Sequence, residues 1–221
     1  MPVLHSTESS ESLPSPSALA HSSIGDLIKR GLDVTLALVL LVSLAPLLFM
    51  IAVLIWLHDG GPVLYRRRVV GRTADFDAFK FRTMRVDADA VLASNPEIRR
   101  EFEQNFKLKK DPRVTRVGAV LRKYSLDELP QLLNVLRGQM SLVGPRMITV
   151  AELPKYGEFE SLLRSVRPGL TGYWQVNGRQ TVGYEERVRM DVYYVQNWSL
   201  PLDVKILLRT PWKILKGEGA Y

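Results

Sequence analysis

One long apolar run constrains the fold of this chain more than any other feature. Val34–Leu57 is 24 residues long and contains no charged side chain. As one α-helix it would measure roughly 36 Å, whereas the hydrocarbon core of a bilayer is roughly 30 Å thick. Length and hydropathy alone therefore predict a helix that crosses a membrane once.

Two features of this run favour a re-entrant helix over a crossing one. Pro46 lies near its middle, where it removes a helix hydrogen bond and favours a kink. Basic side chains flank both ends of the run: Lys29, Arg30, Arg66, Arg67, Arg68 and Arg72. The positive-inside rule then gives no orientation, and a broken helix that enters and leaves on the cytoplasmic face satisfies both observations. We expect residues 26–58 to form such a re-entrant membrane helix.

The rest of the chain divides into a tail and one catalytic domain. Residues 1–25 are rich in Ser and Pro and hold few large apolar side chains, which predicts a disordered tail. Residues 59–221 are expected to form a cytoplasmic domain that is mostly α with a few short β elements. Extended segments are predicted at residues 63–65 and 76–81, whereas residues 143–146 and 167–172 have the Gly and Pro content of loops.

The C-terminal stretch 202–216 has the composition of an interfacial amphipathic helix. Its four cations are spaced 4, 4 and 3 residues apart, which places them on one helical face: Lys205, Arg209, Lys213 and Lys216. The alternative is a helix that packs on the protein's own core. Pro211 argues against one continuous helix.

Residue types that are missing restrict the chemistry. The chain has no Cys, and its three His residues are His5, His21 and His58. The catalytic domain therefore has no Ser-His or Cys-His nucleophile pair and no His/Cys zinc site. After residue 25 the chain carries 30 cations and 21 carboxylates, an excess that suits anionic headgroups, phosphorylated substrates or nucleic acid.

Asp127 and Glu128 are adjacent carboxylates at a predicted helix start. The spacing Ser125-x-x-Glu128 matches a capping box, which is the structural alternative to a catalytic role. The setting favours chemistry, because cations surround the pair along the sequence: Arg113, Arg116, Arg122, Lys123, Arg146 and Arg179. Cations keep a carboxylate ionised and attract phosphate. Asp127 is thus a candidate nucleophile, and Glu128 a candidate ligand for Mg²⁺.

Two other functions remain open on the residues alone. The pairs Asp75-x-Asp77 and Asp87-x-Asp89 fit metal-dependent glycosyltransferases, and such an enzyme using Asp87 and Asp89 would release UDP. The second alternative is a non-enzymatic, membrane-anchored basic module that binds nucleic acid or acidic lipid. That module has no use for paired carboxylates and would need interleaved surface aromatics, so no nucleic-acid partner is expected.

A series of ordered motifs resembles the small bacterial sugar transferases, the monotopic polyprenyl-phosphate phosphoglycosyl transferases. The resemblance runs from about Lys29 to Tyr221, and its ending is most similar to exopolysaccharide-initiating members. Besides the Pro-broken apolar helix, the matching motifs are Lys29-Arg30-x-x-Asp33, Gly60–Val63, Lys80–Met84, Ser125–Pro130, Met140–Arg146, Arg167–Gly172, Gln175–Arg179 and Asp191-x-Tyr193-Tyr194.

The resemblance implies a reaction on a lipid carrier at the cytoplasmic face of the bacterial inner membrane. The residue matching Asp127 attacks the β-phosphate of a UDP-sugar, UMP leaves, and undecaprenyl phosphate accepts the sugar-phosphate from Asp127. The resemblance also implies membrane lipid and downstream polysaccharide-assembly enzymes as partners. The sequence leaves the sugar, the polysaccharide pathway and the oligomeric state open.

The resemblance also implies roles for individual residues. Glu128 is associated with Mg²⁺, and the positions that match substrate-binding groups are Lys80, Arg122, Arg146, Arg179 and Asp191. The chain departs from the usual family pattern at Met147, Gln139 and Ala45, where Pro, Asp and Ser are more common. None of these departures replaces a proposed catalytic group.

Overall fold

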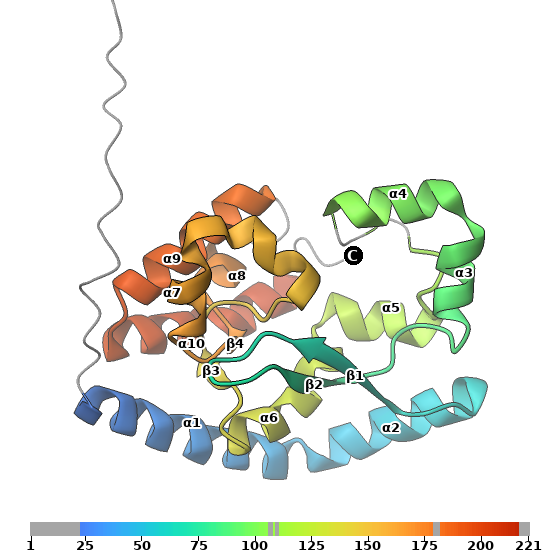
Figure 1. Ribbon diagram of the computed structural model, residues 1–221. Helices are drawn as coiled ribbons and strands as arrows, with labels where there is room; N and C mark the ends of the chain where they lie inside the picture. Colours follow the sequence, from blue (N-terminus) through green and yellow to red (C-terminus); the bar gives the residue numbers. More distant parts are fainter. Residues whose placement is uncertain (1–22, 106–107, 109–110, 179–181, 217–221) are drawn as a thin grey trace, which may run out of the picture.

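The computed structural model describes residues 23–105, 108, 111–178 and 182–216 (Figure 1). Almost all of the expected tail 1–25 lies outside the described residues, and so does Arg179. Helices predominate and the strands are few and short, which confirms the prediction of a mostly α fold.

The apolar run forms two helices, α1 (Ser23–Ser43) and α2 (Ala45–Asp59), bent by 62° where they meet. Pro46 is the second residue of α2, a position where its missing N–H costs no helix hydrogen bond. The Ser43 hydroxyl donates to the Leu40 carbonyl at 3.3 Å, beside the break. Among the described helices none is by itself long and apolar enough to cross a membrane, whereas this bent pair passes by length and composition.

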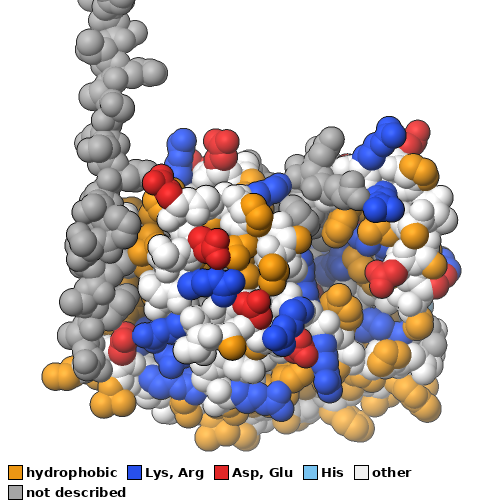
Figure 2. All heavy atoms as spheres, in the orientation of Figure 1, with side chains coloured by type: hydrophobic (Ala, Val, Ile, Leu, Met, Phe, Trp, Pro, Cys, Tyr) orange, Lys and Arg blue, Asp and Glu red, His pale blue; other side chains and the backbone are white. Residues whose placement is uncertain are grey.

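α1 and α2 form the base of the molecule and carry a broad apolar surface, visible along the lower edge of Figure 2. Its large exposed members are Ile24, Leu27, Ile28, Leu32, Leu36, Leu38, Val39, Leu40, Val42, Phe49, Met50, Leu54, Trp56 and Leu57. Their opposite sides pack inward: Ala37 joins the main core, while Ile51 and Ile55 pack with Phe81 and Leu121. The base is therefore part of the fold and at the same time presents an unusually large apolar face.

A β-hairpin and a short 3₁₀-helix form the centre of the molecule. β1 (Leu64–Val69) pairs antiparallel with β2 (Phe76–Phe81), with Lys80 opposite Tyr65. The extended segment expected at 76–81 is confirmed as β2, whereas β1 runs well beyond the segment expected at 63–65. η2 (Leu126–Gln131), a 3₁₀-helix, packs along β2. α5 (Arg116–Lys123) and α6 (Leu132–Leu136) pack against η2, while α3 (Ala88–Ser94) and α4 (Pro96–Asn105) pack against each other.

Two segments expected to be loops contain strands instead. β3 (Ser141–Val143) pairs in parallel with β4 (Gly169–Thr171), and both are largely buried. Three-residue strands are too short to show a hydrophobic period, and their Gly and Pro neighbours obscure them further. α1 and α6 contact β3, and the elements that follow along the chain pack largely against one another: η3 (Val150–Phe159), α7 (Glu160–Arg164), α8 (Tyr173–Asn177) and α9 (Tyr184–Gln196).

α10 (Leu200–Lys216) is one helix, so the expected interruption at Pro211 is wrong. The turns before Pro211 are anchored by the buried side chains of Asp203 and Ile206, which offset the lost hydrogen bond. One side of α10 packs on the core, as the alternative reading required. Its other side exposes large apolar side chains: Val204, Leu208, Trp212 and Leu215.

Candidate active site

The two adjacent carboxylates lie in η2, and the residue before it does not cap them. Ser125 has a φ of 53° and its side chain makes no capping hydrogen bond, so the capping-box alternative is wrong. Glu128 accepts hydrogen bonds from other elements: from Lys80 Nζ at 2.7 Å and from Arg146 Nη2 at 2.8 Å. The structure therefore brings two predicted substrate-binding cations onto one of the predicted catalytic carboxylates.

Glu128 is held in its charged form. Burial alone would raise its pKa, but Arg146 and Lys80 outweigh burial and hold the pKa of Glu128 well below its usual range. The same contact raises the pKa of Arg146 against the opposing effect of its own burial. Lys80, Arg146 and Glu128 therefore form a fixed cluster of ionised groups, in which the two cations compensate the negative charge of Glu128.

Asp127 lies beside this cluster but stays outside its hydrogen bonds. Its side chain is buried, with a relative exposure of 8%, and within the described residues no group donates a hydrogen bond to its carboxylate. Burial raises the pKa of Asp127, and the neighbouring charge of Glu128 adds to this effect, while Lys80, Arg122 and Arg146 oppose it. Two neighbouring carboxylates with pKa values displaced in opposite directions are suited to different chemical roles.

Arg122 reaches the site from α5. Its Nε donates to the Thr83 hydroxyl at 2.9 Å, and its charge interacts with Asp127. Arg122 is half-buried, and this burial lowers the pKa of its guanidinium. Five of the predicted site residues thus gather from four parts of the chain: Lys80, Arg122, Asp127, Glu128 and Arg146.

Asp191 lies behind Arg146, on α9. Its Oδ1 is 3.4 Å from the backbone nitrogen of Arg146, and its Oδ2 accepts a hydrogen bond from the Tyr156 hydroxyl at 2.8 Å. Its residue exposure is 1%, and burial raises the pKa of Asp191 to about 6. In this geometry Asp191 holds the backbone of Arg146. Its contact with substrate stays a prediction.

An aromatic group next to Arg146 was missed by the sequence reasoning. The guanidinium carbons of Arg146 and Arg187 lie 5.8 and 4.9 Å from the ring centre of Trp174. Arg187 also lies 5.0 Å from the ring of Tyr184. These contacts fix the arginine planes through cation–π attraction. The residues are scattered over three elements, so no local sequence pattern could have shown the cluster.

The Asp-x-Asp alternative finds no comparable site. Asp87 is half exposed and pairs with Arg85 at 2.8 Å, while Asp77 pairs with Arg68 at the surface. Within the part of the chain that the structure describes, no three acidic or His side chains converge as metal ligands.

A Mg²⁺ ion shared with a substrate remains compatible with the carboxylate pair. Mg²⁺ commonly takes one or two protein carboxylates and completes its coordination with phosphate and water. Glu128 Oε2 has only a long contact with Arg146 Nη1, at 3.5 Å, so this oxygen and the carboxylate of Asp127 keep acceptor capacity for such an ion.

Among the described residues Asp127 accepts no hydrogen bond, and it lies beside the ionised Glu128 and several Lys and Arg side chains, an arrangement that can attract phosphate. Comparison with known proteins shows the family of the chain. Residues 24–217 match the family described as bacterial sugar transferase. The chain is 45% identical to the exopolysaccharide production protein ExoY of Sinorhizobium fredii over 203 residues, 90% of each chain. The chain belongs to the bacterial sugar transferase family, which confirms the resemblance, and it is a transferase.

Two longer relatives match over part of their length. The undecaprenyl-phosphate galactose phosphotransferase of Salmonella typhimurium is 44% identical over 202 residues, which are 88% of this chain and 42% of that protein. The UDP-glucose:undecaprenyl-phosphate glucose-1-phosphate transferase of Escherichia coli K12 is 37% identical over 209 residues, 90% and 43% respectively. This chain thus corresponds to less than half of each of these two proteins.

Proposed function

We propose that this enzyme transfers a hexose-1-phosphate from a UDP-sugar to undecaprenyl phosphate and so starts an exopolysaccharide or capsule. Two kinds of observation support the proposal. The names of relatives such as the galactose and glucose phosphotransferases describe this type of transfer. The site offers a carboxylate nucleophile and several cations, and its part of the chain lacks the His and Cys that other nucleophile systems need.

The observation that carries the proposal is the state of Asp127. Its carboxylate is buried and accepts no hydrogen bond from the described residues, so no donor among them reduces its nucleophilicity. Glu128, by contrast, is committed to Lys80 and Arg146. Of the two, Asp127 is therefore the group free to form a bond to phosphorus.

The proposed reaction has two displacements at one phosphorus atom. An Asp127 oxygen attacks the β-phosphorus, the bridging P–O bond breaks, and UMP leaves with the bonding electrons. A phosphate oxygen of undecaprenyl phosphate then attacks the same phosphorus, and the bond to Asp127 breaks, which regenerates the carboxylate. Lys80, Arg122 and Arg146 stabilise the charge on the phosphoryl oxygens during both steps.

Mg²⁺ is the proposed cofactor, held by Glu128 and the substrate phosphates, where it would neutralise phosphate charge. The enzyme's own residues keep separate tasks. Asp127 provides the nucleophile, and the arginine and lysine side chains orient the diphosphate.

The proposed location is the cytoplasmic face of the bacterial inner membrane. The exposed apolar surface of α1 and α2 would enter the bilayer as a re-entrant pair, and the apolar side of α10 would lie in the interface. In this arrangement the lipid carrier reaches the site from the membrane side, and the UDP-sugar from the cytoplasm. Downstream polysaccharide-assembly enzymes would take up the lipid-linked product.

Asp127→Asn tests the proposal directly. The amide keeps the shape of the side chain but does not attack phosphorus, so UMP release should fall by roughly 1,000-fold or more while the thermal unfolding temperature changes little. Glu128→Gln should lower activity and weaken its response to added Mg²⁺.

Asp87→Asn is the matched control, because it makes the same chemical change at an exposed carboxylate of the rival motif. Its turnover should equal that of the wild type. Release of UDP in place of UMP, or near-normal turnover of Asp127→Asn, would overturn the proposal.

A further inference from the structure

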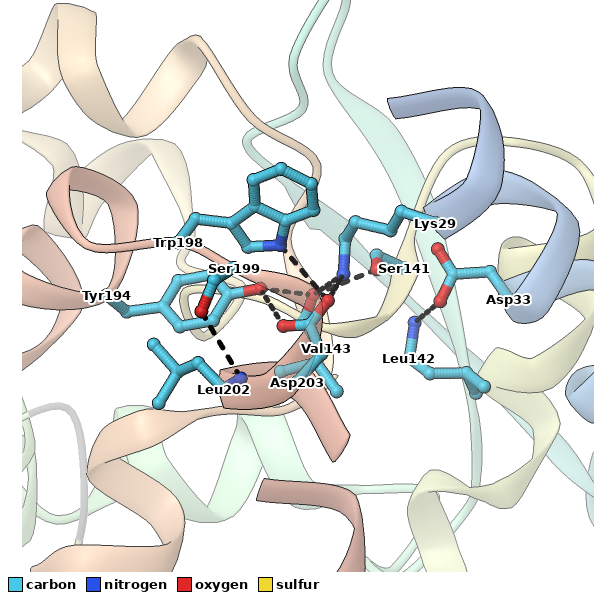
Figure 3. A network of polar contacts seen from close by, with 10 residues as sticks. All are labelled: Lys29, Asp33, Ser141, Leu142, Val143, Tyr194, Trp198, Ser199, Leu202 and Asp203. Carbon is cyan, nitrogen blue, oxygen red and sulfur yellow. Dashed lines mark hydrogen bonds and ion pairs between the residues drawn. The ribbon is translucent and has the colours of Figure 1, made fainter. Parts of the chain in front are cut away.

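Two charged side chains of α1, Lys29 and Asp33, hold strand β3 through hydrogen bonds to its backbone, and this set of contacts is called the grip of α1 on β3 (Figure 3). Lys29 Nζ donates to the Val143 carbonyl at 3.0 Å and to Asp203 Oδ2 at 2.5 Å. Asp33 Oδ1 accepts the backbone N–H of Leu142 at 2.9 Å. Lys29 and Asp33 are one helical turn apart and share a face of α1. Successive residues of β3 are therefore fixed by the apolar helix.

The grip is completed by α9 and α10 (Figure 3). The Tyr194 hydroxyl lies 2.7 Å from Asp203 Oδ1 and 3.1 Å from the Val143 carbonyl, and Trp198 Nε1 donates to Asp203 at 3.1 Å. Burial raises the pKa of Tyr194, as does the adjacent Asp203, so its hydroxyl stays a donor. Removing Lys29 would leave Asp203, with 6% exposure, as a buried carboxylate without its cation.

The link from this grip to the active site is short and stiff. Only Gly144 and Pro145 separate Val143, which Lys29 holds, from Arg146, which binds Glu128. Between them the Gly144 N–H donates to the Thr171 carbonyl at 3.0 Å. A Cβ atom on Gly144 would lie 2.6 Å from a backbone oxygen, so the segment is packed without spare room. A displacement of β3 would therefore be passed on to Arg146.

We infer that Lys29 and Asp33 are positioning residues that set the place of the Arg146 guanidinium through β3. The apolar helix pair then supplies part of the active-site geometry in addition to any anchorage. This inference rests on the proposed function, because it takes Arg146 to stabilise the reacting phosphoryl group. A merely structural role would instead lower the amount of folded enzyme and leave each folded molecule unchanged.

A double-mutant cycle on the full-length enzyme in detergent separates these roles. Lys29→Met should lower kcat/KM for UMP release, per folded molecule, by roughly tenfold. In an Arg146→Met background the same change should cost less than roughly twofold, because the group that it positions is already gone. Arg30→Met is the matched control: it also removes a cation from α1, but Arg30 binds the Val135 and Leu136 carbonyls. Its effect should be equal in both backgrounds.

An equal loss from Lys29→Met in both backgrounds would overturn the inference. Should Lys29→Met fail to fold, Asp33→Ala removes the acceptor of the Leu142 N–H and leaves the Asp203 network in place, and its cycle has the same two outcomes. If the wild-type enzyme releases no UMP, the proposed function falls and the inference falls with it. Additive effects in an active wild type overturn only the positioning role.

Discussion

Replacing Asp191 by Asn should change how the stability of the enzyme depends on pH. Burial raises the pKa of Asp191 from 3.8 to about 6 in the folded protein, although Arg187 and the Tyr156 hydroxyl oppose this effect. Its stabilising contribution is therefore fully present below pH 3.8 and is lost as the pH rises through about 6. The difference between these pKa values corresponds to roughly 3 kcal/mol of unfolding free energy.

The assay is denaturant unfolding of the wild type and Asp191→Asn between pH 3.5 and 8. The amide stays neutral and can still accept the Arg146 N–H, so the variant should lack this fall. The wild-type minus variant difference should decline by roughly 3 kcal/mol, mostly between about pH 4 and 7. Groups that titrate in both proteins cancel. Asp87→Asn, at an exposed site where the Arg85 hydrogen bond lowers the carboxyl pKa, should give no fall of the difference with rising pH. A flat difference for Asp191→Asn would refute the buried-carboxylate reasoning.

Other predictions concern phosphate binding and topology. Arg146→Lys should lower kcat/KM for UDP-sugar by roughly tenfold or more, because Lys does not reproduce a planar fork, whereas Arg68→Lys at an exposed pair should be silent in the same kinetic assay. Cys residues placed singly at Ser10 and His58 of this Cys-free chain should both escape an impermeant maleimide in intact cells. Pro46→Leu should favour a spanning helix, so that Ser10 becomes labelled, and an unchanged labelling pattern would contradict the role assigned to Pro46.

Local signals predicted the local structure. The extended segment expected at residues 76–81 is strand β2, with those bounds. The bend beside Pro46 was equally visible, because one residue type sets it. By contrast, β3 and β4 exist through pairing between segments far apart in the chain, which no short window of sequence contains.

The site could be predicted to the same extent: residues close together in the sequence were identified, whereas contacts between distant segments were not. Asp127 and Glu128 could be singled out because they are neighbours in the sequence, Arg146 was one of the cations near them along the chain, and the family resemblance supplied Lys80. The sequence did not reveal that Lys80 and Arg146 bind Glu128, or that no described residue donates a hydrogen bond to Asp127, since both depend on tertiary distances. Nor did it reveal the aromatic contacts of Arg146, which come from another part of the chain.

The grip of α1 on β3 also sets an order of events during synthesis. Lys29 is 114 residues from Val143 and 174 residues from Asp203, so it leaves the ribosome long before either partner. Contacts of such sequence separation form late and slow the closure of a fold. Under the proposed membrane placement, the helix pair would be inserted first, and the catalytic domain would fold afterwards onto a helix already in place. A chain that begins after residue 58 would therefore lack α1, the helix whose Lys29 and Asp33 hold strand β3.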